Sequence, residues 1–327
     1  MLDVISIGDA RIDNVLVVSE AHVECTFNKQ KCEICLKFGG KIPVEQIFTT
    51  VAGNNANNSV ALSRLGIKTA LFANTGDDEN GKRILDYLKK EGVDTKYIKL
   101  HPKMAAEIST IISFKGERTI LVFHQPWVYN LPDFERTKWV YLSSTSYSFT
   151  QTDFISQIEH YVERIGCKMV FAPGTYQLKY GIKKFPRLLR LVNILIVNKE
   201  EAKEILGIDE AKKIDIKKLL EELFKLGPQK IVITDGAEGS YSFDGENYLH
   251  LLPFRAKLVE ATGAGDAYAA ALMTGLIHGK NLAEAMRWGA ANGAAVVEEI
   301  GPQAGLLSSD NLQKKLKENS KIVATKL

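Results

Sequence analysis

The sequence predicts an α/β fold, in which helices cover both faces of a mostly parallel, doubly wound sheet and a small β-sheet forms a lid. Short β-rich apolar runs alternate with amphipathic helical segments along most of the chain. These runs do not alternate regularly between apolar and polar residues, which is typical of strands buried on both faces. Two segments carry β-type runs with no helix between them, and they predict the second sheet.

The main sheet is predicted from apolar runs that mostly end at small, polar or turn residues. They are residues 3–8, 69–76, 139–144, 168–173, 194–199 and 230–236. Helix-like segments separate or follow these runs. They are residues 55–66, 79–92, 154–166, 199–207, 216–227, 267–279, 281–299 and 309–318. Alternation of this kind predicts parallel strands joined by helices.

The lid is predicted from the two segments that break this rhythm. Residues 11–42 contain short β-type runs, and residues 97–125 read as a hairpin with a Gly-containing turn at "KGER". We expect the two segments to join in space as a small sheet over one mouth of the core. The core is then formed by residues 1–10, 43–96 and 126–327.

The composition narrows the class of protein. The 327 residues are 45% hydrophobic and 25% charged, as in ordinary globular proteins. A net charge of +3 with scattered lysines gives no reason to expect nucleic acid or an anionic membrane as a partner. No apolar run approaches the length of a membrane span, and "MLDVISIGDA" reads as a strand rather than a signal peptide. We expect a cytoplasmic protein.

Three cysteines lie close together in "CTFNKQKCEIC". Cys25, Cys32 and Cys35 could hold a structural zinc ion if a fourth ligand such as His22 joined them. Their spacing does not closely match a standard zinc knuckle. We therefore expect ordinary reduced thiols, with zinc as the alternative.

The segment "EATGAGDAYAAA" predicts an anion-binding helix start. An alanine-rich helix begins near Asp266, and Gly263, Ala264 and Gly265 precede it. Glycines let a ligand approach the backbone, and the first amides and the positive dipole end of the helix favour an anion. Asp266 would repel a phosphate, so it either caps the helix or has a chemical role beside a phosphate.

Two later motifs have the residue types of a nucleotide site. Asn198 ends a strand and Glu201 lies in the next helical turn, so this pair either caps the helix or orients hydrated Mg²⁺. Thr234, Gly236 and Gly239 follow another strand, where glycines either admit a ligand or simply mark turns. By contrast, "GDDENGKR" only approximates a phosphate-binding P-loop, and we expect a turn and a helix start there.

Polar residues also gather near the N-terminus. Asp13 follows the first strand, and "AGNNANNSVALSRLG" supplies Gly53, Asn54 and Asn57 at a helix entrance. Loops at the carboxyl ends of strands line the ligand crevice of an open α/β sheet. Carboxylates and amides form hydrogen bonds with hydroxyl groups, so a polyol is the natural ligand. Helix capping and turn formation are the alternative.

Together these motifs resemble those of the ribokinase-like (PfkB) family of sugar and nucleoside kinases, over nearly the whole chain. The matching features, in the family's order, are "GD" with Asp13, "AGNNANNSVALSRLG", "NKEE", "TDGAEG" and "EATGAGD". The last is similar to the family's second signature, D-T-x-G-A-G-D. The resemblance implies a ribokinase-like fold and transfer of a phosphoryl group from ATP to a hydroxymethyl group.

The resemblance also implies a role for each motif at the reaction centre. Asp266 would be the general base that takes the hydroxyl proton. The amides of Gly263, Ala264 and Gly265 would form an anion hole for the transferring phosphoryl group.

The remaining motifs would hold the two substrates and the metal. Asn198 and Glu201 would position Mg²⁺ and phosphates, with Glu201 acting through water. The residues that would border the nucleotide are Thr234, Gly236 and Gly239. Those that would hold or approach the acceptor are Asp13, Gly53, Asn54, Asn57 and, from the lid, Arg118.

This sequence departs from the family pattern at three places. Glu260 and Ala261 replace the usual D-T pair, whose acid commonly helps to ligate a monovalent cation, so the sequence argues against potassium activation. Ala52 replaces the first glycine of a G-G pair, and "FAPGTYQ" stands where sugar kinases often show an Asp-Pro-Asn segment. The last two changes fall on the acceptor side, so the acceptor is the most open question.

Several hypotheses remain. The first acceptor is a sugar or sugar acid. The alternative is a nucleoside, which an aromatic platform formed by Phe123, Trp127 or Tyr147 would favour. A non-catalytic binding protein is a third hypothesis, against which the retained Asp266 argues. Lid sheets in this family often pair between subunits, so a homodimer through an exposed edge near residues 108–123 is also implied.

Overall fold

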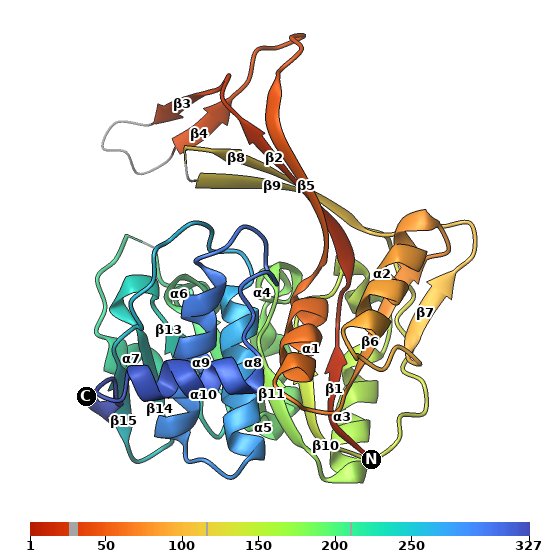
Figure 1. Cartoon of the computed structure of the whole chain (residues 1–327). Coiled ribbons are helices and arrows are strands. Elements are labelled where there is room, and N and C mark those ends of the chain that lie inside the picture. The colour runs from red at the N-terminus through yellow and green to blue at the C-terminus, as the bar shows by residue number, and fades with distance from the viewer. Residues whose placement is uncertain (26–31, 116, 210) are drawn as a thin grey trace.

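The computed structural model describes residues 1–25, 32–115, 117–209 and 211–327, and it shows a layered α/β body with a β lid above it (Figure 1). Within those residues the main sheet has ten strands, in the order β16-β15-β14-β13-β12-β11-β10-β1-β6-β7. The strands are β1 (Leu2–Ile7), β6 (Thr69–Gly76), β7 (Ile98–His101), β10 (Thr137–Leu142), β11 (Lys168–Phe171), β12 (Ile194–Asn198), β13 (Ile231–Thr234), β14 (Ser240–Phe243), β15 (Tyr248–Leu251) and β16 (Thr325–Lys326). From β13 to β7 all neighbours run parallel, and β14 to β16 add an antiparallel edge. The predicted doubly wound, mostly parallel sheet is confirmed.

Helices cover both faces of this sheet. They are α1 (Asn54–Arg64), α2 (Glu79–Lys90), α3 (Phe154–Ile165), α4 (Thr175–Tyr180), α5 (Pro186–Leu191), α6 (Lys199–Leu206), α7 (Ile216–Phe224), α8 (Ala264–Ile277), α9 (Leu282–Val296) and α10 (Ser309–Glu318). Successive side chains of a strand point to opposite faces of the sheet, so alternate residues pack against different helix layers. In β1, Ile5 and Ile7 pack with α3, α5, α6 and α7, whereas Val4 packs with α1, α2, α8 and α9.

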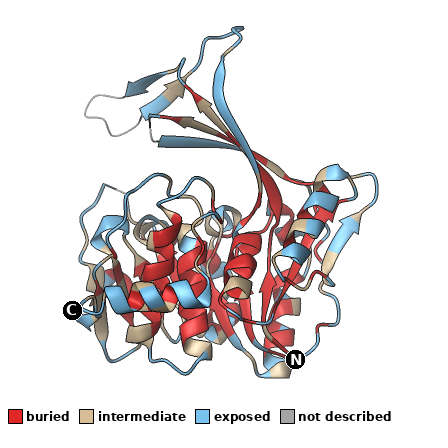
Figure 2. Ribbon diagram, viewed as in Figure 1, coloured by how far each residue is buried: buried red, intermediate tan, exposed pale blue. Residues whose placement is uncertain are grey.

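The lid contains a four-stranded sheet in the order β5-β2-β8-β9. Its strands are β2 (Arg11–Val18), β5 (Val44–Ala52), β8 (Ile108–Phe114) and β9 (Glu117–Phe123). The hairpin expected around "KGER" is confirmed, because β8 and β9 pair antiparallel from Ile108 and Phe123 to Phe114 and Glu117. The whole of β9 is exposed, whereas the body is filled with buried residues (Figure 2).

Strand pairing places two segments differently from the expected division into core and lid. Residues 44–52 were expected in the core, but β5 pairs antiparallel with β2 and lies in the lid sheet. Residues 98–101 were expected in the lid, but β7 pairs parallel with β6 at the edge of the main sheet. In both places the apolar pattern indicates a strand without indicating which sheet the strand joins.

The cysteine segment forms a two-stranded hairpin of its own, β3 (His22–Cys25) with β4 (Cys32–Cys35). Cys25 and Cys32 form a disulfide, so the expectation of reduced thiols was wrong for this pair. The proposed zinc set of Cys25, Cys32, Cys35 and His22 also fails, because the disulfide uses two of its thiols and His22 pairs with Cys35 on the opposite face of the ribbon. Cys35 and Cys167 are free thiols.

Among the described residues, no helix combines the length and the apolar character that crossing a membrane requires.

Candidate active site

The polar motifs lie at one edge of the main sheet. The parallel strands β1, β10, β12 and β13 all end at the edge that faces the lid (Figure 1). Strand β2 leaves this edge soon after β1 and carries Asp13 into the lid sheet. Motifs that are far apart in the sequence therefore meet where an open α/β sheet binds its ligands.

Helix α8 begins at this edge with a glycine turn. Gly263 is the N-cap residue with a φ of 80°, in the left-handed region that favours glycine. Its carbonyl accepts a hydrogen bond from the amide of Ala267 at 2.9 Å. No side chain caps the helix, so the structure does not support the alternative that Asp266 is only a cap. At the positive dipole end of α8, the amide of Ala264 makes only a long hydrogen bond, 3.4 Å to the carbonyl oxygen of Ala261.

The carboxyl group of Asp266 is buried, with 7% of the residue exposed. It accepts hydrogen bonds from Nδ2 of Asn54 at 3.1 Å and from Nδ2 of Asn57 at 2.9 Å. Burial raises the pKa of Asp266 to about 7, the two amides oppose this rise, and the nearby carboxylates of Glu201 and Asp13 add to it. A carboxyl group that titrates near neutrality can exchange a proton with a bound ligand.

Two cavities meet at the glycine turn. One lies between lid and body, has a volume of about 650 Å³, and is lined by Gly263 and Asp266 among others; we call it the lid cavity. The other lies beside α8 and α9, has a volume of about 520 Å³, and is lined by Ala264 and Gly265 among others; we call it the helix cavity. Groups bound in the two cavities would therefore meet at the start of α8.

The lid cavity collects the residues expected to hold a polyol. Its lining contains Asp13, Gly53, Asn54, Asn57 and Arg118. Asp13 is buried, and among the described residues its Oδ1 has no hydrogen-bond partner. Burial raises the pKa of Asp13 against the opposing effects of Arg11 and Ser109. An unpartnered carboxylate oxygen beside a cavity is suited to accept a hydrogen bond from a ligand hydroxyl.

One chain of hydrogen bonds connects the lid to the glycine turn. Arg118 of β9 donates to Oγ1 of Thr262 at 2.7 Å. Thr262 donates to Oε1 of Glu260, and Oε2 of Glu260 accepts from the amide of Gly301 at 2.7 Å. Both carboxylate oxygens of Glu260 are therefore already bonded within the protein, at the position where the family pattern has a cation-ligating acid.

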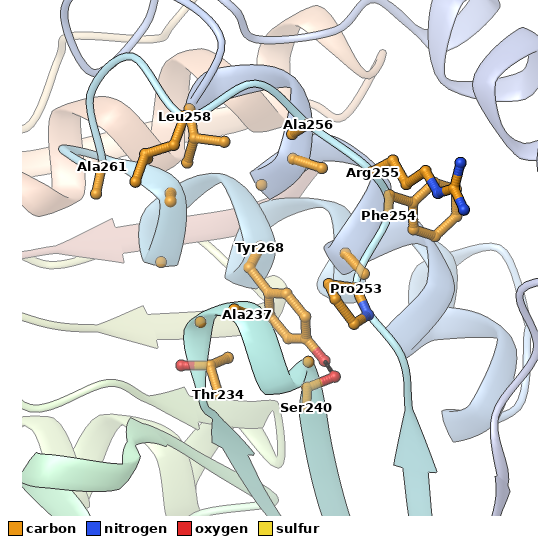
Figure 3. Close-up of a pocket in the computed structure, with 18 residues that line it drawn as sticks. Thr234, Ala237, Ser240, Pro253, Phe254, Arg255, Ala256, Leu258, Ala261 and Tyr268 are labelled. Atoms are coloured by element: carbon orange, nitrogen blue, oxygen red, sulfur yellow. Dashed lines mark hydrogen bonds between the residues drawn. The ribbon is translucent and has the colours of Figure 1, made fainter.

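The helix cavity holds Thr234, Gly236 and Gly239, together with Tyr268 of α8 (Figure 3). The hydroxyl group of Tyr268 donates to Oγ of Ser240 at 3.0 Å. Gly239 has a φ of 89°, and a Cβ atom there would lie 2.1 Å from the carbonyl oxygen of Leu251. Much of the remaining lining is small and apolar: Ala237, Ala256, Ala261, Ala290, Ala294 and Val297. Such a surface suits a flat, weakly polar group.

Asn198 and Glu201 cap helix α6 and line neither cavity. Oδ1 of Asn198 accepts from the amide of Glu201 at 2.8 Å, and Oε2 of Glu201 accepts from the amide of Asn198 at 2.8 Å. Burial raises the pKa of Glu201 to about 7. The cap uses Oε2 and leaves Oε1 to accept from a water, so the pair fits Mg²⁺ held through water rather than directly.

The lining of the lid cavity includes residues that the sequence reasoning missed. Arg11, His124 and Lys179 all line it. Lys179 lies on α4 with Thr175 and Tyr176, and their one-turn spacing could have signalled a shared face. Arg11 forms an ion pair with Asp9, and His124 one with Glu107, and no local sequence signal marks either pair.

The three aromatic residues named as candidates for a nucleobase platform do not form one in the lid cavity. Phe123, Trp127 and Tyr147 are absent from the lining of the lid cavity. Trp127 is buried, with its ring centroid 4.9 Å from that of His101. Tyr176 is the aromatic residue that lines the described part of the cavity beside His124.

The glycine turn makes a prediction about stability. Gly263→Ala should lower the free energy of unfolding by about 1–3 kcal/mol, because a positive φ strains an L residue and the new Cβ would lie 2.6 Å from the Pro302 carbonyl oxygen. Gly265→Ala is the matched control, since its Cβ would meet nothing within 4 Å. Alanine also favours the helix, by up to about 1 kcal/mol. Urea denaturation measures both variants, and equal destabilisation would contradict this geometry.

Comparison with known proteins gives the chain its family. The family model described as pfkB family carbohydrate kinase matches residues 12–309. The 5-dehydro-2-deoxygluconokinase of Halalkalibacterium halodurans is 26% identical over 291 residues, which are 83% of this chain and 87% of that protein.

Two solved structures share the fold. The ribokinase of Arabidopsis thaliana, complexed with ribose and ATP, aligns with a TM-score of 0.79 and 20% identity over 97% of this chain and 99% of that one. A nucleoside kinase of Methanocaldococcus jannaschii aligns with a TM-score of 0.78 and 20% identity over 98% of this chain and 99% of that one. The family model spans most of the sequence, and the protein therefore belongs to the pfkB family of carbohydrate kinases, with the ribokinase-like fold.

Proposed function

We propose that the protein is an ATP- and Mg²⁺-dependent kinase that transfers the γ-phosphoryl group of ATP to a hydroxymethyl group of a sugar or sugar acid. The observation that carries this proposal is the glycine turn, which borders both cavities and holds the buried carboxyl of Asp266 at their junction. Phosphoryl transfer depends mostly on positioning and on charge stabilisation. A base and an anion site at the same point supply the positioning and the charge stabilisation.

In the proposed reaction the acceptor occupies the lid cavity and the nucleotide the helix cavity. The acceptor oxygen attacks the γ-phosphorus and forms a new O–P bond. The bond from the γ-phosphorus to the bridging oxygen breaks, and its electron pair leaves with ADP. Asp266 takes the proton of the acceptor hydroxyl, for which a pKa of about 7 is well matched. The amides of Gly263, Ala264 and Gly265 stabilise the charge of the transferring group.

The other residues hold the two substrates in place. The small apolar lining of the helix cavity would contact the adenine ring, while Thr234, Gly236 and Gly239 border the nucleotide. Mg²⁺, when bound, supplies positive charge at the β- and γ-phosphates. Glu201 would hold that ion through a water, and Asn198 keeps the Glu201 side chain in place through the helix cap.

A sugar acid is the acceptor that the charges of the lid cavity favour. Arg118 and Lys179 line this cavity and have no acidic partner among the ion pairs of the described residues. Asp13 is available for hydroxyl groups, and a carboxylate on the acceptor would pair with Lys179. The name of the relative from Halalkalibacterium halodurans, 5-dehydro-2-deoxygluconokinase, also points to an acceptor of the gluconate type.

A nucleoside is the second candidate acceptor. The fold is shared with the nucleoside kinase of Methanocaldococcus jannaschii, and Tyr176 offers one aromatic face in the lid cavity. Against this candidate, Phe123, Trp127 and Tyr147 do not line that cavity.

Two expectations stay predictions, one implied by the family and one by this chain's departure from the family pattern. A homodimer through the lid has an available edge, because Leu121 and Phe123 of β9 are 56% and 51% exposed. Independence from potassium agrees with the bonded state of both Glu260 oxygens.

The first prediction from this proposal concerns turnover. ADP release with ATP and Mg²⁺ should be stimulated by one class in a panel of sugars, sugar acids and nucleosides. Asp266→Asn should lower that rate about 10²–10⁴-fold, because general-base removal typically costs this much. Sodium and potassium buffers should give equal rates. Binding of ATP and acceptor without any turnover would instead support the non-catalytic alternative.

The second prediction concerns the charge of the acceptor. Lys179→Met should raise the KM for sugar acids about tenfold, as expected for the loss of one charged hydrogen bond. The KM for neutral sugars and kcat should be unchanged. Lys183→Met is the control, because Lys183 is exposed on the adjoining turn and does not line the cavity. An equal change for acidic and neutral acceptors would refute this role for Lys179.

A further inference from the structure

Gln303 lies behind the active site, in the segment between α9 and α10, and only 3% of the residue is exposed. It is remote in the sequence from every motif of the family resemblance. We infer that Gln303 is a positioning residue that orients Asn57 and, through it, the carboxylate of Asp266. This inference rests on the function proposed above, in which Asp266 is the base.

A continuous line of side-chain hydrogen bonds leads from Gln303 to the reaction centre. Nε2 of Gln303 donates to Oδ1 of Asn57 at 2.8 Å, and Nδ2 of Asn57 donates to Oδ2 of Asp266 at 2.9 Å. Nε2 of Gln303 also donates to the carbonyl oxygen of Val51 at 3.0 Å. On the other side, the hydroxyl group of Tyr87 donates to Oε1 of Gln303 at 2.8 Å.

The direction of this line is fixed by an atom that can only accept. The carbonyl oxygen of Val51 requires the NH₂ group of Gln303, so the amide of Gln303 has one orientation. The second hydrogen of that NH₂ group then requires the oxygen of Asn57. With its oxygen held there, Asn57 must present its own NH₂ group to Asp266.

A comparison with Asn54 shows what the hydrogen bond from Gln303 adds to Asn57. It also donates to the Asp266 carboxylate, at 3.1 Å, but it is exposed. Asn57 is buried and held on its oxygen side. The other charged or titratable groups that act on Asp266 are Asp13 and Glu201, together with Tyr141 of β10. None of these three donates a hydrogen bond to the carboxylate, so the two asparagines orient it.

These hydrogen bonds stabilise the ionised form of Asp266, which the proposed base requires, in a buried position. A buried carboxylate that loses a donor is less stable as an ion, and its proton is bound more tightly. If Asn57 could rotate, its oxygen would face the oxygen of Asp266 and repel it. Gln303 prevents that rotation. It does so from outside the lid cavity, where it would contact neither substrate in the proposed complex.

The test uses Gln303→Met, which keeps the length of the side chain and removes its donors. With ATP and the preferred acceptor, kcat should fall about tenfold, the size expected for one hydrogen bond to a charged group. Both KM values should stay within about twofold of the wild type. The acidic limb of the kcat–pH profile should move to higher pH, a readout that loss of stability alone would not shift.

Three further variants define the path. Tyr87→Phe removes the bond to Oε1 of Gln303, together with interactions of that hydroxyl group with Glu91 and Arg64, and it should leave kcat close to the wild type. Asn57→Leu should lower kcat, and adding Gln303→Met to it should cause no further loss if the two residues act as one unit. Additive losses in the double variant would overturn the inference.

A measurement without turnover separates this inference from the proposed function. In the wild type, the side-chain amide NMR signals of Asn57 and Gln303 should shift with the same midpoint as the Asp266 carboxyl carbon. This outcome supports positioning even if no acceptor is ever phosphorylated. The inference would be overturned if the Gln303 signals did not change with the ionisation of Asp266 in a protein that folds and turns over normally. This measurement is made on the wild type, so it does not depend on the folding of any variant.

Discussion

The arrangement of this site depends on one constraint, a left-handed glycine that starts a helix between two cavities. Gly263 leaves the first amides of α8 without a side-chain cap, and the next three residues bring Asp266 to the same point. The backbone there has no room for a side chain, because Pro302 lies against the position of a Cβ atom. The lid, the strand ends and α1 are all placed around this turn, so the helix N-terminus and the carboxyl group of Asp266 belong to one structural element.

The same turn places an acid where burial opposes its charge. The fold compensates with Asn54 and Asn57, which donate to both oxygens of Asp266. The compensation is incomplete, and burial still raises the pKa of Asp266 to about 7. Between the ordinary pKa of a free carboxyl and this value, the folded protein binds a proton that the unfolded chain releases. Stability therefore falls as pH rises through that window, because ionisation of the buried Asp266 costs folding free energy.

Much of the fold could be predicted from the sequence, because buried parallel strands and amphipathic helices leave distinct patterns. The hairpin of β8 and β9 and the start of α8 follow from local signals of this kind. The sheet that β5 and β7 join, by contrast, depends on pairing with distant strands, and the disulfide of Cys25 and Cys32 depends on the register of a ribbon. Residues of several motifs line the two cavities, whereas Asn198 and Glu201 line neither, and no motif contains Lys179 or Gln303. Such residues reach the site only through packing between elements that are far apart in the sequence.

The central claim is that a buried Asp266, titrating near neutrality, is the base that works beside the glycine turn. Its most direct test is the pH dependence of kcat/KM for the phosphorylated acceptor, with Mg²⁺ and ATP saturating. We predict that log(kcat/KM) rises with pH at unit slope and levels off above a midpoint near the pKa of about 7 that burial gives Asp266. A rate that stays flat from pH 5 to pH 8 would contradict the account, because the ionisation of Asp266 would then play no part in the transfer.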